Sequence, residues 1–485
     1  MALTLRRGRP RALPHAHRAG FVAELPTSVP ARTMAVSSWP MWVLGFAAMI
    51  DNVDQYIVRG AANHIESAFR VDDLAIGVLF SAFILVNGVV TMPAGYLADR
   101  WNRTRTMAVT IAAWSLISAL GGLVPTGAFA LLVVMRGALG FGQAITDPSG
   151  SSLVADFYTL ERRGKAFSVQ QCLVYLGLGL GLVVGAAFAT HFGHLGWRLA
   201  FGVSIVPGLL IAWWCRRLPE PTRGGADQAY ARADTQIEVA EHHREPLLPE
   251  GVGRFLVDVV RGLRADVRTI LDIATMRYAL VGVSAILFVV TAVATWMPTF
   301  YERQLHLHEG AANAAFGLLV VGAGIPGTII GGRIADRWVH RFLGARMVIP
   351  GVCLAASSSL FIVSFLPLPF GVVYGVQLVA FFAATCSVPA LRAGLSDTVP
   401  AHLRGTGFGA FNLASVVFGA AAAPVITSSL ANAFGGDYRT AFLVVMPFAL
   451  LGALFLLAAR RHIAEDTAKL FQAVVAAMAA EQSRS

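Results

Sequence analysis

Two aspartates in the first apolar stretch of the chain are well placed for chemistry. Asp51 and Asp54 lie about ten and thirteen residues into an apolar segment, residues 41–63, close to mid-membrane if that segment is a helix rising ~1.5 Å per residue. Their spacing of three puts both on one helix face. Carboxylates are expensive at that depth, so we expect them to face a cavity and to bind or move something. A buried structural ion pair is the alternative.

A second polar set lies in the fourth apolar segment. Arg136 and Gln143 are seven residues apart, and Gln143 and Asp147 are four apart, so all three share a helix face. Arg136 is expected to pair with Asp54 or to hold an anionic headgroup, and a purely structural cation is the alternative. Asp51 and Asp54 of the first segment lie close together, and two neighbouring carboxyl groups tend to keep one proton between them. This property suits a proton carrier.

Charged residues at the ends of apolar segments form a third set. Asp99 ends the second segment, where its carboxylate can pair with an arginine or with a neighbouring helix N-terminus. We expect such pairs to close one side of the protein as a gate; simple anchoring of the loops is the alternative. The residues assigned to this gate are Gly95, Asp99, Arg100 and Arg103 in the first half and Asp336, Arg337 and Arg392 in the second.

The sequence lacks the residue patterns of an enzyme active site. All twelve histidines fall in tails, loops or loop edges, with no metal-ligand spacing, and no nucleophile elbow or phosphate-binding Gly-Lys-Ser/Thr loop occurs. Four cysteines are scattered through apolar stretches without paired spacing. We therefore expect no enzyme activity, no metal and no cofactor, with protons as the possible coupling ion.

The composition requires a membrane. Charged residues make up 14% of the 485 residues, where a soluble protein carries about a quarter. The hydrophobic fraction is 56% and the mean hydropathy is +0.64. The net charge of +10 comes from arginines in short groups between apolar runs, which indicates membrane orientation rather than nucleic-acid binding.

Twelve apolar segments are long enough to cross ~30 Å of hydrocarbon. They are residues 41–63, 74–97, 105–125, 127–154, 164–190, 197–215, 277–300, 311–335, 346–366, 370–395, 404–429 and 438–459. Basic residues follow spans two, four and eight, whereas the loops 124–128, 190–196, 366–370 and 430–437 hold no Lys or Arg. The positive-inside rule then predicts an integral plasma (inner) membrane protein with both termini in the cytoplasm.

An internal repeat predicts the architecture. The stretch from Gly95 to Trp101 recurs from Gly332 to Trp338, and three later landmarks recur in the same order. Two similar six-span halves are expected to rock about a substrate held between them. The predicted division is a disordered tail, 1–39; a six-helix half, 40–215; a cytoplasmic linker with an amphipathic helix, 216–272; a second half, 273–461; and a cytoplasmic tail, 462–485.

The motifs also carry a family resemblance. The stretch GYLADRWNRTR at 95–105 closely resembles the signature loop of the major facilitator superfamily. Further stretches are similar to the spinster-type transporters: DQYIVRG at 54–60, GFGQA at 140–144, LVADFY at 153–158 and TWMPTFYER at 295–303. The resemblance implies an all-α fold of twelve transmembrane helices and transport of lysophospholipids or sphingoid phosphates, for which proton coupling is proposed.

Two positions depart from that resemblance. Asp54 matches the family's first-span acid, but Gln55 stands where the family has arginine and Gln143 where it has glutamate. Losing both members of a charge pair leaves neither buried alone, yet it puts the family's coupling scheme in question, and Asp147 is a candidate replacement acid.

We expect a secondary transporter, working as a monomer by alternating access, for a lysophospholipid or similar amphiphile. A proton-coupled multidrug or organic-anion transporter of the same superfamily is the alternative.

Overall fold

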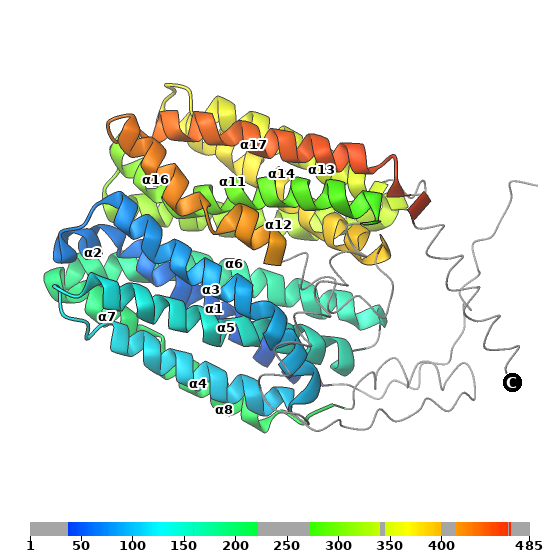
Figure 1. Cartoon of the computed structure of the whole chain (residues 1–485), viewed down its shortest axis with the longest axis horizontal. Helices are drawn as coiled ribbons and strands as arrows, with labels where there is room; N and C mark the ends of the chain where they lie inside the picture. Colours follow the sequence, from blue (N-terminus) through cyan, green and yellow to red (C-terminus); the bar gives the residue numbers. More distant parts are fainter. Residues whose placement is uncertain are drawn as a thin grey trace, which may run out of the picture.

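A computed structural model describes residues 37–158, 160–221, 272–339, 345–398, 413–463 and 465–466, and every regular element within them is helical. Figure 1 shows the long helices lying side by side in two groups, one coloured blue to green and the other green to red. The predicted N-terminal tail, nearly all of the predicted linker and most of the C-terminal tail lie outside the described residues.

The first group contains the predicted N-terminal half. Short turns separate its helices, and the sixth predicted span is divided at Ser204 into α7 and α8. Its helices are α1 (Trp39–Gly60), α2 (Ala62–Phe69), α3 (Asp73–Arg100), α4 (Arg103–Gly121), α5 (Phe129–Phe157), α6 (Leu160–His191), α7 (Gly196–Val203) and α8 (Ile205–Arg217).

The second group contains the C-terminal half. A short π-helix, Val416–Ala420, interrupts the eleventh predicted span before α16. The helices are α11 (Ala274–Leu305), α12 (Glu309–Val339), α13 (Ala345–Ser364), α14 (Phe370–Thr398), α16 (Ala423–Ala433) and α17 (Tyr438–Ala459).

Ten segments among the described residues are long and apolar enough to cross a membrane. The two other predicted spans, α1 and α4, are helical as well but carry more polar residues. Asp51 and Asp54 lie within α1, and Arg103 and Arg105 begin α4, which lowers their mean hydropathy. The all-α membrane fold predicted from the sequence is confirmed.

Glycines allow α1 and α6 to approach closely. Gly177, Gly181 and Gly185 recur every four residues along one face of α6, and each packs on a backbone carbonyl of α1. A Cβ atom built at Gly181 would lie 2.6 Å from the carbonyl oxygen of Val53. Small residues at such contacts are typical of membrane helices, where packing rather than the hydrophobic effect drives association.

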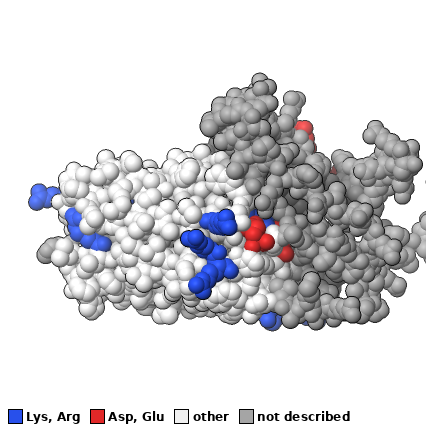
Figure 2. All heavy atoms as spheres, turned by 90° about the horizontal axis from the view of Figure 1, so that it is seen from below, with Lys and Arg blue, Asp and Glu red and all other residues white. Residues whose placement is uncertain are grey.

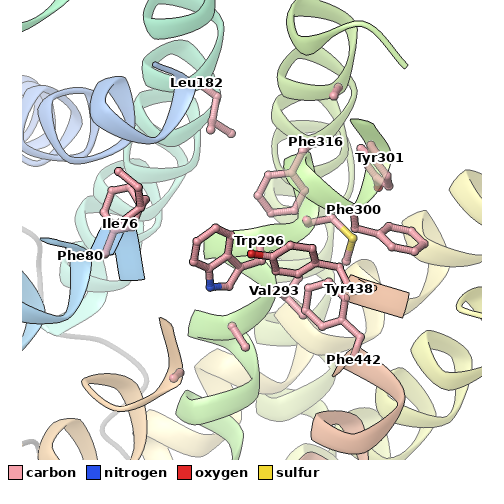
Figure 3. Packing of buried hydrophobic residues seen from close by; sticks show 14 of the residues in the cluster. Ile76, Phe80, Leu182, Val293, Trp296, Phe300, Tyr301, Phe316, Tyr438 and Phe442 are labelled. Carbon is pink, nitrogen blue, oxygen red and sulfur yellow. The ribbon is translucent and has the colours of Figure 1, made fainter. Parts of the chain in front are cut away.

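The two halves meet at two pairs of helices. Helix α6 packs on α12 and α3 packs on α16. Gly179 faces Gly317 across the first contact: a Cβ at Gly179 would lie 3.1 Å from the Gly317 carbonyl oxygen. A buried apolar cluster bridges the halves, with Phe80 on one side and Trp296 on the other (Figure 3).

The outer surface suits a lipid environment. Large apolar side chains are exposed along the helices, among them Val109, Val134 and Val206. Figure 2 shows one largely uncharged face, on which basic side chains gather beside the residues drawn in grey and at the far end. An exposed apolar surface of this extent is expected to contact lipid.

Replacing Gly181 by valine is expected to destabilise the N-terminal half, because backbone of α1 occupies the space the new side chain needs. Overpacking of this kind costs about 1–3 kcal/mol, so the melting temperature of the purified protein should fall by several degrees. Gly322→Ala is the matched control, since no atom lies within 4 Å of a Cβ built there. Equal stability of the two variants would contradict the packing.

Candidate functional site

Asp54 and Arg136 form a buried ion pair inside the N-terminal half. Each is 1% exposed, and Arg136 Nη1 lies 3.4 Å from Asp54 Oδ2. Ser204 donates a hydrogen bond of 3.0 Å to the same carboxylate, and Ser118 donates a shorter one. Four parts of the half, namely α1, α4, α5 and the α7–α8 junction, therefore meet at this carboxylate. The pairing of Arg136 with Asp54 foreseen from the sequence is present.

The other predicted polar residues are placed differently. Asp51 Oδ1 is buried and forms no hydrogen bond with the described residues, and it lies within electrostatic range of Asp54 and Asp147. Asp147 is exposed on α5. Gln143 is 2% exposed and its Nε2 forms no hydrogen bond with the described residues. The three acids thus lie near one another, and their roles in proton coupling stay predictions.

A cavity of about 190 Å³ lies between the two halves. It is lined by Gln55, Tyr56, Arg59, Phe80, Phe83, Ile84 and Arg136 from α1, α3 and α5, and by Val290, Thr291, Ala294 and Thr295 from α11. Two of the predicted site residues, Gln55 and Arg136, are in this lining. Apolar side chains surround two guanidinium groups, an arrangement that can hold an anion next to an apolar group.

Arg59 is a cavity residue that the sequence analysis did not single out. It is 8% exposed, and its guanidinium lies over the Phe80 ring, 3.8 Å from the ring centroid. The sequence did hold a signal for it. Arg59 is a charged residue in the apolar first span and follows Gln55 by four residues, so both residues share a helix face.

The predicted gate residues lie toward the other end of the bundle from α2. Gly95, Asp99 and Arg100 belong to the last turns of α3, Asp336 and Arg337 to those of α12, and Arg392 to α14. Arg337 is exposed, and the side chains of the other five are outside the described structure. Their gating role stays a prediction.

Arg103 connects parts of the N-terminal half. It is fully buried and pairs with Asp156 at the end of α5 and with Glu220 after α8, the latter at 2.8 Å. The partners described for Arg103 lie in the N-terminal half and, with Glu220, at the start of the predicted linker, so these contacts fix the linker's first residues to that half.

Among the described residues, polar contacts between the halves lie at the α2 end, the end of the bundle where α2 lies. Arg303 of α11 donates two hydrogen bonds, of 2.6 and 2.8 Å, to Asp73 at the start of α3. Tyr438 of α17 donates a third, of 2.8 Å, to Asp73. Asn63 donates to Glu302 at 2.7 Å. These bonds hold the two halves together at the α2 end.

Glu66 of α2 lies beside this group. Burial raises its pKa to about 9, and a hydrogen bond and the negative charge of Asp73 act in the same direction. The charge of Arg303 opposes the rise and that of Glu302 adds to it. With Glu66 protonated, Asp73 and Arg303 balance each other in charge.

Comparison with known proteins identifies the family. The model of the Major Facilitator Superfamily matches residues 44–421, so the chain belongs to this superfamily of transporters. A bacterial homologue of the human lysosomal transporter Spinster, solved in an inward-facing and unoccupied conformation, has the same fold, with a TM-score of 0.68 and 19% identity over 90% of this chain and 99% of that one.

Characterised relatives include the spinster proteins. Human protein spinster homolog 1 is 27% identical over 314 residues, which are 61% of this chain and 54% of that protein. The zebrafish sphingosine-1-phosphate transporter SPNS2 is 24% identical over 302 residues, 60% of this chain and 55% of that one. The chain thus spans about half the length of these relatives, which are transporters rather than enzymes.

Breaking the buried pair is expected to destabilise the protein. Asp54→Asn or Arg136→Gln leaves one partner of the pair buried and unpaired, which costs about 3–5 kcal/mol. The double variant removes both charges, so its melting temperature should fall by clearly less than the sum of the two single effects. Additive losses in a double-mutant cycle would show that the two side chains do not interact.

The α2 end is expected to open as the pH rises. The pKa of Glu66 is raised from 4.5 to about 9 in the closed arrangement, so closure is fully favoured below ~4.5 and loses this contribution as the pH rises through about 9. Distances between spin labels on cysteines introduced at Ser67 and His308, both exposed, should lengthen over that range.

Glu66→Gln serves as the control for this titration. The amide stays neutral, so the label distances should no longer respond to Glu66 between pH 5 and 9.5. His64, which lies 3.3 Å from Glu309 at the same end, is retained in both proteins. An unchanged pH response in Glu66→Gln would assign the opening to other groups.

Proposed function

We propose that the protein moves a lysophospholipid or similar amphiphile across the membrane by alternating access, coupled to protons. The observation that carries this proposal is the cavity between the halves, where two arginines and several apolar side chains line one space. An anionic headgroup with an adjoining hydrocarbon chain has the matching chemistry. The similarity to spinster proteins and to a sphingosine-1-phosphate transporter supports the same substrate class.

The size of the cavity favours a closed conformation. Its 190 Å³ is below the ~300–1,000 Å³ of pockets that enclose a drug-sized ligand. A lysophospholipid therefore needs the halves to separate further at one end. In the proposed cycle, the contacts of Asp73 and Arg303 close the α2 end while the opposite end admits or releases substrate.

The orientation follows from the basic loops. Arg162, Arg163 and Lys165 lie in the first turns of α6, at the end opposite α2. The positive-inside rule assigns that end to the cytoplasm and the α2 end to the outside of the plasma membrane. The contacts at the α2 end are then an outer gate, and Asp99 and Asp336 belong to the inner one.

Asp51 is the acid best suited to carry the proton. Asp54 already accepts hydrogen bonds from Ser118 and Ser204 and pairs with Arg136. Asp51 has a buried oxygen that forms no hydrogen bond with the described residues. We assign the proton to Asp51, with Asp54 holding Arg136 in place.

Proteoliposomes with a pH-sensitive dye inside test this function. Addition of a lysophospholipid is expected to drive proton movement in the wild type, and Asp51→Asn should abolish the proton signal, because the amide cannot release a proton. Transport of fluorescent lysolipid is followed in parallel, so substrate movement and proton movement are measured separately.

The outcomes separate the candidates. Lysolipid transport without any proton signal in the wild type would remove the proton coupling and leave the substrate class intact. A response to a cationic drug alone would exclude the lipid and favour a multidrug transporter. A response to small organic anions alone would favour the organic-anion alternative.

Asp72→Asn is the control, because it exchanges an aspartate for asparagine at an exposed position. Asp156 is not suitable for this purpose, because its carboxylate pairs with the buried Arg103.

A further inference from the structure

Arg59 is a buried cation that its described surroundings do not neutralise. It is 8% exposed, and its Nε and Nη1 form no hydrogen bond with the described residues. Its guanidinium lies over the ring of Phe80, whose centroid is 3.8 Å from the guanidinium carbon. A cation–π contact contributes about 2 kcal/mol when desolvated, which is less than the several kcal/mol that burying an ion costs.

The second cavity cation lies close to the first. Arg136 lines the same cavity as Arg59, and the two guanidinium charges are near enough to repel each other. Arg136 has Asp54 as its partner, and its Nε is also free of hydrogen bonds with the described residues. Two cations thus line the cavity, and the carboxylate of Asp54 lies behind Arg136. Both arginines keep N–H groups that form no hydrogen bond with the described residues.

Arg59 and Gln55 share one face of α1. Arg59 follows Gln55 by four residues, about 6 Å nearer to the α2 end, and both residues line the cavity. The positive charge of the α1 wall therefore lies on the α2 side of a neutral amide.

We propose that Arg59 determines the headgroup specificity of this transporter, by binding with Arg136 an oxyanion, phosphate or carboxylate, of net negative charge. This inference rests on the proposed function. Guanidinium groups present several N–H donors in a planar fork, which suits two-point binding of an oxyanion. The Thr291 and Thr295 hydroxyls on the opposite wall are further groups that can reach a bound headgroup.

The same charges disfavour a zwitterionic headgroup. A quaternary ammonium attached to the phosphate would enter a cavity with two guanidinium groups and one carboxylate, and like charges in a low-dielectric site repel strongly. Discrimination then comes from repulsion as well as attraction, as is usual for specific sites. Lysophosphatidate should accordingly bind more tightly than lysophosphatidylcholine of the same acyl chain.

The test measures binding to the full chain in lipid nanodiscs. The probes are oleoyl lysophosphatidate, oleoyl lysophosphatidylcholine and glycerol 3-phosphate, which carries the headgroup without the chain. Hydrogen bonds to charged groups contribute enough that Arg59→Gln should weaken lysophosphatidate binding by about ten-fold or more. Binding of lysophosphatidylcholine should change by less than about three-fold.

Three further variants control the result. Arg59→Lys keeps the charge and should retain most of the preference for the anionic lipid. The double variant Gln55→Arg with Arg59→Ala moves the cation back by one turn and should restore part of that preference. Arg217→Gln removes an arginine that also lies over an aromatic ring, 4.0 Å from the Trp213 centroid. Arg217 is not among the residues that line the cavity, so this variant should bind all three probes as the wild type does. Melting temperatures confirm that each variant is folded.

The outcomes distinguish this inference from the proposed function. Lysolipid binding of equal strength in wild type and Arg59→Gln would overturn the role of Arg59 and leave the lipid substrate standing. Binding of glycerol 3-phosphate that depends on Arg59, with no lysolipid binding, would support the anion site and exclude the lipid. Binding of none of the three probes would overturn both.

Discussion

A buried ion pair organises the N-terminal half of this transporter. Asp54 draws donors from Ser118, Ser204 and Arg136, so helices distant in sequence must converge on one carboxylate. Burying a charge in an apolar bundle is costly unless the charge is paired and hydrogen-bonded, so this convergence stabilises the fold of the half. The pair also sets the direction of Arg136, whose guanidinium reaches the cavity wall while Asp54 stays behind it. One wall of the cavity is thus built on a structural contact.

The interface between the halves combines two kinds of contact. Along α6 and α12 it is made by small residues such as Gly179 and Gly317, which bring backbones together without interlocking side chains. At the α2 end it is made by polar groups, with Asp73 and Arg303 at the centre. The energy of an apolar contact between small residues changes little when the two halves tilt against each other. An ion pair such as that of Asp73 and Arg303 is directional, so it either forms or breaks. Such a division suits a protein that rocks between two discrete states.

Membership of the major facilitator superfamily leaves the substrate open, since one fold hosts many specificities. The charge along α1 bears on that specificity. Gln55 and Arg59 stand one turn apart on the same face and both line the cavity, so the positive charge of this wall lies toward the α2 end. An exchange of charge between these two positions would alter the contacts available to a ligand without altering the fold.

The sequence by itself determined the membrane class, the helical segments and the two-half architecture, because hydropathy, loop charge and the repeat of residues 95–101 are local or periodic signals. It also gave pairing with Asp54 as one of the two expectations for Arg136. Only the tertiary structure decided that Arg59 lines the cavity, that Asp54 lies behind it, and that Arg303 and Asp73 join the halves. These facts depend on which faces of α1, α3, α5 and α11 meet across hundreds of residues, and no spacing within one helix encodes that.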